Sequence, residues 1–141
     1  MLKERSMLYL GYGMNMNVDS MASRCPAAVS LGGFYLPNYR LVFRGVADVV
    51  EDKDSYVPVA LWLITKKCLK SLDQLEGYPS LYNRKIINGR WWMYYMNDKS
   101  FLAPPSEHYY KTIENGYDAF DLDSRSIRVA KKEAINSIIA A

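Results

Sequence analysis

Histidine and cysteine are almost absent from this chain of 141 residues, which has one histidine, His108, and two cysteines, Cys25 and Cys68. Four nitrogen and sulfur ligands for a zinc ion cannot be assembled from so few side chains, so we predict no metal site. We also expect no disulfide framework, and reduced thiols in a cytoplasmic protein. A Cys–His nucleophile stays open as a minor alternative, because the sequence does not exclude contact between His108 and either thiol.

Long apolar runs and a strong excess of charge are also missing. No apolar stretch approaches the ~20 residues that a membrane helix needs, and the run before Gly11 is too short for the core of a signal peptide. The net charge is +3, and no Lys/Arg cluster exceeds two adjacent residues. A nucleic-acid-binding protein would show a stronger basic patch. We therefore expect neither a membrane nor a nucleic-acid partner.

Glycine is sparse, yet Gly11 and Gly13 both interrupt the apolar, strand-like run LYLGYGMN at residues 8–15. A plain hairpin turn needs less than this, so the spacing indicates a loop whose backbone bends sharply or closely approaches something. The loop lacks a following Gly-Lys-Ser/Thr and a third glycine, which excludes a phosphate loop and a dinucleotide fingerprint. An enzyme of this composition would rely on carboxylates, hydroxyls and backbone amides.

Hydrophobic periodicity and turn residues predict one α+β domain over residues 1–141, built on a mainly antiparallel sheet or small β-barrel with flanking helices. Strands are expected at 7–10, within 29–52 with a break at Pro37-Asn38, at 56–65, and in a hairpin at 82–96 that turns at Asn88-Gly89. Helices are expected at 17–24 with Asp19 as cap, at 66–77 between Thr65 and Gly77, from Ser106 to near Gly116, and at 131–140.

Glu76 is the candidate that pattern alone provides. In the predicted helix, Leu69, Leu72 and Glu76 fall on neighbouring positions of one face, while Leu75 extends the apolar side and Asp73 faces water. Partial burial and the negative end of the helix dipole would both raise the pKa of this carboxyl group. The alternative is a surface glutamate that points outward or pairs with Arg84.

The sequence also resembles the γ-glutamylcyclotransferases, especially their small bacterial relatives. YLGYGMNMN is similar to the family's Tyr-Phe-Ala-Tyr-Gly-Ser-Asn motif, and further family blocks follow in order: MASRCPAA, LPNYRLVFRG, VPVALWLIT, LDQLEGYPSLYNRK, YYMN and PPSEHYYKTIENGY. The resemblance covers about residues 9–123. It implies a small mixed barrel with flanking helices, and an enzyme that cyclises a γ-glutamyl amide to 5-oxoproline with release of an amine or amino acid, without a cofactor.

The resemblance also implies roles for particular residues. Glu76 matches the catalytic acid/base, and backbone N–H groups of the glycine loop would bind the small-molecule γ-glutamyl substrate. The implied substrate-binding residues are Tyr9, Leu10, Gly11, Tyr12, Gly13, Met14, Asn15, Tyr82, Tyr95 and Tyr109. For each tyrosine, core packing is an equal alternative.

Two further alternatives stay open. Met14 replaces the motif's serine, so a non-catalytic small-molecule-binding domain that keeps the fold is the second hypothesis. The aromatic cluster RWWMYYM at residues 90–96 is consistent with a homodimer surface, although buried strand packing is the interpretation that we favour.

Overall fold

Two long strands, β2 (Val29–Arg44) and β3 (Val46–Thr65), form an antiparallel hairpin that turns at Gly45. The computed structural model describes residues 5–140. Gly45 has a φ of 81°, a conformation that glycine adopts without a side-chain clash. The predicted break at Pro37-Asn38 is a register shift inside β2, and β3 runs unbroken where two strands were expected. A bulge accommodates the proline and the pairing then resumes.

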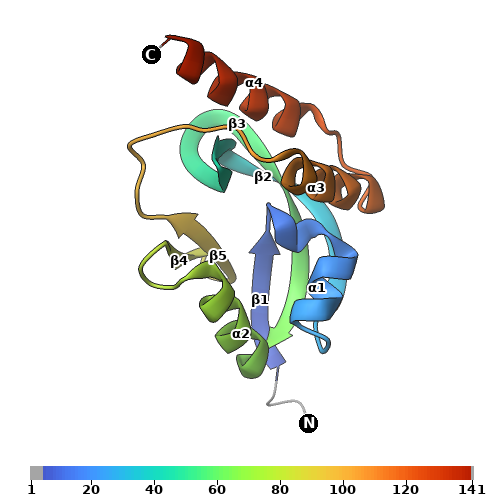
Figure 1. The fold of residues 1–141 in the computed structure, drawn as a ribbon. Coiled ribbons are helices and arrows are strands. Elements are labelled where there is room, and N and C mark those ends of the chain that lie inside the picture. The colour runs from blue at the N-terminus through green and yellow to red at the C-terminus, as the bar shows by residue number, and fades with distance from the viewer. Residues whose placement is uncertain (1–4, 141) are drawn as a thin grey trace.

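The remaining strands complete a mixed sheet. β1 (Arg5–Gly11) pairs antiparallel with β3 and parallel with β5 (Trp91–Met96), while β4 (Tyr82–Ile87) pairs antiparallel with β5. The order is β2-β3-β1-β5-β4, with β1 at the centre (Figure 1). The α+β class and the mainly antiparallel sheet are confirmed. Within residues 5–140 the sheet does not close, however, so the predicted barrel is an open sheet.

The helices flank this sheet: the short 3-10 helix η2 (Met14–Met16), α1 (Val18–Arg24), α2 (Lys66–Glu76), α3 (Glu107–Ala119) and α4 (Arg125–Ala140). Thr65 and Ser106 cap α2 and α3 as predicted, and Gly77 ends α2 in the left-handed conformation. The predicted Asp19 cap is wrong, because Asn17 accepts the Ser20 N–H at 3.0 Å. α3 continues past Gly116, and α4 begins earlier than expected.

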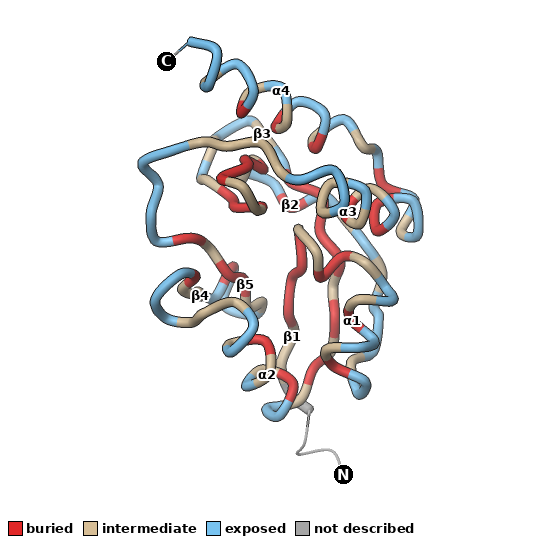
Figure 2. The backbone as a smooth tube through the Cα atoms, in the orientation of Figure 1, coloured by how far each residue is buried: buried red, intermediate tan, exposed pale blue. Residues whose placement is uncertain are grey.

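The core lies between the sheet and the helices. Figure 2 shows buried residues along β1 and in the adjoining parts of the sheet. Each helix adds fully buried side chains, including Met21, Leu72, Tyr117 and Ile127. Within the cluster at 90–96, Met93, Tyr94 and Met96 are buried, whereas Trp91, Trp92 and Tyr95 are only partly buried, so the packing interpretation describes part of the cluster. A homodimer stays a prediction.

The two cysteines form a disulfide, so the expectation of two reduced thiols is wrong. Cys25 caps the end of α1, and Cys68 lies in the first turn of α2. The bridge joins positions separated by 43 residues, a proximity that no local sequence signal shows. It leaves no free thiol, which excludes the Cys–His nucleophile. A cytoplasmic location stays a prediction, now without the argument from reduced cysteines.

No helix within residues 5–140 has the length and apolar character to cross a membrane. In the same part of the chain, no group of three or more His, Cys, Asp or Glu side chains is arranged to hold a metal ion.

Candidate active site

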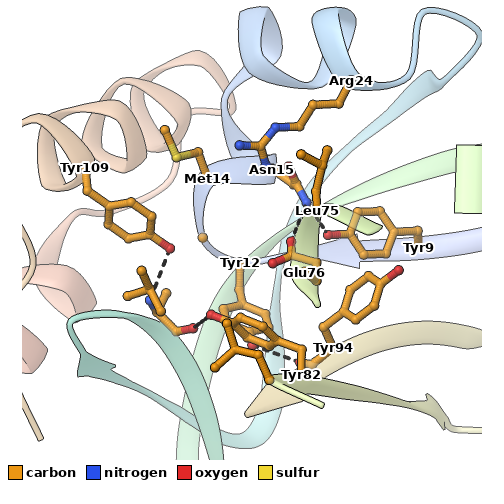
Figure 3. A pocket seen from close by; sticks show the side chains of 14 residues that line it. Tyr9, Tyr12, Met14, Asn15, Arg24, Leu75, Glu76, Tyr82, Tyr94 and Tyr109 are labelled. Atoms are coloured by element: carbon orange, nitrogen blue, oxygen red, sulfur yellow. Dashed lines mark hydrogen bonds between the residues drawn. The ribbon is translucent and has the colours of Figure 1, made fainter. Parts of the chain in front are cut away.

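A cavity of about 160 Å³ opens beside the end of β1, between η2, the last turn of α2 and the hairpin of β4 and β5. An apolar cavity of ~150 Å³ is large enough for a benzene molecule, so this one has room for a small organic group. Figure 3 shows its lining side chains. The residues that line it are Tyr9, Tyr12, Gly13, Met14, Asn15, Arg24, Val46, Ala47, Leu75, Glu76, Leu81, Tyr82, Tyr94 and Tyr109.

Glu76 is the last residue of α2 and lines the cavity. Its predicted partner Arg84 instead pairs with Asp73, at 3.0 Å, so the alternative of a Glu76–Arg84 pair is wrong. Asp73 also accepts a hydrogen bond from the Tyr94 hydroxyl and is therefore not a solvated residue as expected. Leu75 departs from the expected apolar face as well, because it lies at the cavity with 55% of its surface exposed.

Asn15 connects three of the cavity's side chains. Its Nδ2 donates to the Tyr9 hydroxyl at 2.7 Å and to Glu76 Oε2 at 3.1 Å. Its Oδ1 accepts from Arg24 Nη1 at 2.6 Å. The amide thus presents its oxygen to the cation and its nitrogen to the carboxylate, the only orientation that satisfies both. The backbone carbonyl of Asn15 accepts from Trp62 Nε1 at 2.9 Å, which fixes the residue in the core.

Gly11 and Gly13 of the glycine loop both pack closely against other residues of the protein. A Cβ at Gly11 would lie 2.9 Å from the backbone oxygen of Asn15. A Cβ at Gly13 would lie 3.1 Å from both the Ala47 Cβ and the Tyr109 hydroxyl. The two glycines therefore let the loop fold back tightly enough to bring Asn15 into the cavity.

Two tyrosine hydroxyls are held by the backbone of Ala47. The Tyr82 hydroxyl donates to the Ala47 carbonyl at 2.6 Å, and the Tyr109 hydroxyl accepts the Ala47 N–H at 3.1 Å. Ala47 is anchored in turn by its neighbour Asp48, which is fully buried. Asp48 accepts from Arg44 at 2.8 Å, from Lys99 at 2.7 Å and from the Met96 N–H at 2.8 Å. One wall of the cavity is thereby fixed by a buried ionic network.

The cavity changes the acidity of its ionisable groups. Burial raises the pKa of Glu76, although the positive charge of Arg24 and the Asn15 hydrogen bond act in the opposite direction. Burial likewise raises the pKa of Tyr109 to about 12, so its hydroxyl keeps its proton at neutral pH. Glu76 is thus a carboxylate whose affinity for a proton is increased by its surroundings.

Most of the sequence-predicted residues come together here, and three do not. Tyr9, Tyr12, Gly13, Met14, Asn15, Glu76, Tyr82 and Tyr109 line the cavity. Leu10 and Gly11 are buried behind it. Tyr95 does not line it, because adjacent strand residues point to opposite faces and Tyr94 takes the inward position. The Tyr95 ring contacts Lys85 and Lys99 instead.

Sequence reasoning missed two polar lining residues, Arg24 and Tyr94, and the apolar Val46, Ala47 and Leu81. Arg24 lies in the block MASRCPAA, but no spacing in that block indicates that its side chain reaches a glutamate 52 positions away. Tyr94 lies beside Tyr95, and only the strand register decides between them.

The fold and this cavity define a class of protein: an α+β domain that presents one partly buried glutamate among tyrosines. Residues 9–118 match the family described as gamma-glutamyl cyclotransferase, AIG2-like, and the chain belongs to that family. No curated protein matches the sequence.

Solved structures share the fold. An uncharacterized protein from Homo sapiens is 25% identical, with a TM-score of 0.75 over 91% of this chain and 88% of that one. A gamma-glutamyl cyclotransferase is 21% identical, with a TM-score of 0.74 over 96% and 99%. YkqA from Bacillus subtilis is 22% identical, with a TM-score of 0.75 over 93% of this chain and 55% of YkqA. Below 25% identity, such likeness speaks to the fold alone.

Proposed function

We propose that this protein cyclises γ-glutamyl amides or dipeptides to 5-oxoproline and releases an amine or amino acid, with Glu76 as the general acid and base. The family points to this type of enzyme. The observation that carries the proposal is the Glu76 carboxylate in a cavity, hydrogen-bonded to the buried Asn15.

The reaction is an internal displacement. The substrate's α-amine attacks its own γ-carbonyl carbon, a C–N bond forms in a five-membered ring, and the bond to the leaving amine breaks. Since both reacting groups belong to one molecule, holding the productive conformer supplies much of the rate; effective molarities of order 10⁵–10⁸ M are attainable. A cavity walled by tyrosines whose hydroxyls are fixed on Ala47 suits that positioning task.

Glu76 is proposed to move the proton. The α-ammonium must lose a proton before it attacks, and an ordinary glutamate is a weaker base than an amine by at least ~3.5 pKa units, or roughly 5 kcal/mol. Burial raises the pKa of Glu76 and narrows this gap. The proton taken from the ammonium is then donated to the departing amine. As the intermediate collapses, the ring nitrogen returns its second proton to Glu76, and the released amine takes up that proton to leave as an ammonium.

The negative charge that develops on the γ-carbonyl oxygen needs hydrogen-bond donors. Backbone N–H groups of the glycine loop are our candidates.

The experiment is 5-oxoproline release from a panel of γ-glutamyl amides by the wild type, Glu76→Gln and Tyr95→Phe. We expect Glu76→Gln to lose about 10²–10⁴-fold in rate and to stay folded. Tyr95→Phe is the matched control, because Tyr95 lies outside the cavity. Full activity in Glu76→Gln would contradict the assigned role.

The second candidate is a binding domain without catalysis, which Met14 in place of the motif's serine favours. No release from any amide by a folded wild type, together with release by Met14→Ser, would support this candidate.

A further inference from the structure

Arg24 and Glu76 are the two formally charged side chains among the residues that line the cavity. Arg24 is the last residue of α1 and Glu76 the last residue of α2. The Cys25–Cys68 disulfide ties these two helices together next to Arg24. The cavity therefore presents one cation and one anion from two covalently linked helices.

The two charges are held apart rather than paired. The Asn15 side chain lies between them, accepting from Arg24 at 2.6 Å and donating to Glu76 at 3.1 Å (Figure 3). Among the described residues, Arg24 makes no other side-chain hydrogen bond and no ion pair. A guanidinium group has five N–H donors. Arg24 thus keeps donors for a ligand, and its charge is not neutralised by a carboxylate of the protein.

A ligand that matches this arrangement carries a carboxylate and an ammonium close together. The α-carbon of a γ-glutamyl group carries both, so a single head group can reach both sides of the Asn15 amide. Arginine suits the carboxylate because its planar fork of donors matches the two oxygens.

We propose that Arg24 binds the α-carboxylate of the γ-glutamyl substrate, while Glu76 faces the α-ammonium group. This inference rests on the proposed function and adds a residue that reads the substrate's head group. It restricts the substrates to compounds with a free α-carboxylate, whatever the leaving amine.

Substrate binding would also change the charges that act on Glu76, the proposed base. In the free protein the charge of Arg24 lowers the pKa of Glu76 against the effect of burial. A bound α-carboxylate would offset that charge and so raise the pKa of Glu76, in opposition to the α-ammonium group that Glu76 faces. The other ionisable groups around Glu76 are the tyrosines Tyr9, Tyr12, Tyr82, Tyr94 and Tyr109, which stay neutral because burial raises their pKa values.

A structural role for Arg24 is the competing explanation, since its bond to Asn15 also orients that amide. The two roles are separated by pairing a change in the protein with a change in the substrate. A γ-glutamyl anilide and its α-carboxamide counterpart are compared with wild type, Arg24→Gln, Arg24→Lys and Arg90→Gln. Arg90 is an exposed arginine outside the cavity and controls for loss of one positive charge.

For the wild type and Arg90→Gln we expect kcat/KM to favour the α-carboxylate substrate by about 10–100-fold, the range for a hydrogen-bonded charge pair. In Arg24→Gln the preference should fall to within about threefold, and Arg24→Lys should restore part of it. The readout is a ratio within one protein, so a smaller folded fraction does not affect it. The altered amine acidity of the carboxamide affects all the proteins equally.

An unchanged preference in Arg24→Gln, with both substrates slowed alike, would overturn the inference and leave Arg24 a purely structural role. The preference for the α-carboxylate compound can also be measured without turnover. The affinities of the two compounds are compared in the single variant Glu76→Gln and in the double variant Glu76→Gln, Arg24→Gln. A carboxylate preference that disappears with Arg24 would support the inference even if the wild type cyclises nothing, whereas equal binding of both compounds to Glu76→Gln would overturn it.

Discussion

At the scale of the residue, the surroundings of Glu76 disfavour the ionised carboxylate, the form that the proposed reaction needs. Burial raises the pKa of its carboxyl group, which means that the folded protein holds the Glu76 proton more tightly than the unfolded chain does. The stability that follows is present below the unfolded pKa and is lost as the pH rises through the higher folded pKa. Ionised Glu76 therefore costs stability at neutral pH, a common property of functional groups.

This cost gives a prediction for Glu76→Gln. The variant should unfold at a higher temperature than the wild type at about pH 7, because a neutral amide replaces a partly buried charge. The difference should shrink toward about pH 4, where the wild-type carboxyl group becomes protonated. Thermal unfolding across this pH range measures it.

Glu51→Gln is the control, since Glu51 is exposed and should show no comparable gain. An unfolding temperature of Glu76→Gln at or below that of wild type at every pH would contradict the prediction.

At the scale of the element, the site depends on how closely α3 packs against η2. A Cβ at Gly116 of α3 would lie 2.9 Å from the backbone carbon of Met16. This close approach also places Tyr109, about two turns earlier on the same face of α3, beside the glycine loop, where its hydroxyl lies close to Gly13. Gly116 therefore sets the distance between the helix and the loop.

Gly116→Ala should destabilise the protein by about 1–3 kcal/mol through this backbone clash, outweighing the ~1 kcal/mol that alanine offers in a helix. The adjacent Asn115→Ala is the control, because Asn115 is exposed and alanine there should be neutral or slightly stabilising. Denaturant unfolding of both variants measures the change in the free energy of unfolding. Equal stability of the two would show that α3 can move away from η2 without cost.

At the scale of the whole molecule, the disulfide connects parts that the chain itself keeps far apart. It closes a loop between α1 and α2 that contains all of β2 and β3, across a sequence separation of 43 residues. Loop-closure entropy predicts a stabilisation of about 4 kcal/mol for a loop of this length.

Reduction of the wild type should therefore lower its free energy of unfolding by about that amount. Urea unfolding with and without a thiol reductant measures the change, with thiol labelling to establish the redox state. The double variant Cys25→Ala, Cys68→Ala is the control, since it should not respond to reductant. An identical midpoint for fully reduced and oxidised wild type would contradict the prediction.

The sequence by itself determined the features that depend on a few neighbouring residues. Thr65, Ser106 and Gly77 mark helix ends because capping is a contact within one turn. Asn88-Gly89 turns the β4–β5 hairpin because both residues accept positive φ angles, 53° and 71°. Helical spacing made Glu76 a candidate for the inner face of α2 for the same local reason, with a surface glutamate as the alternative.

Only the tertiary structure decided which distant side chains meet. The register of β5 turns Tyr94 inward and Tyr95 outward, and a slip of one residue would reverse them. Arg24 reaches the site through Asn15, and Cys25 reaches Cys68, because the sheet brings α1 beside α2. Such contacts depend on the packing of the whole chain, and no pattern of neighbouring residues encodes them.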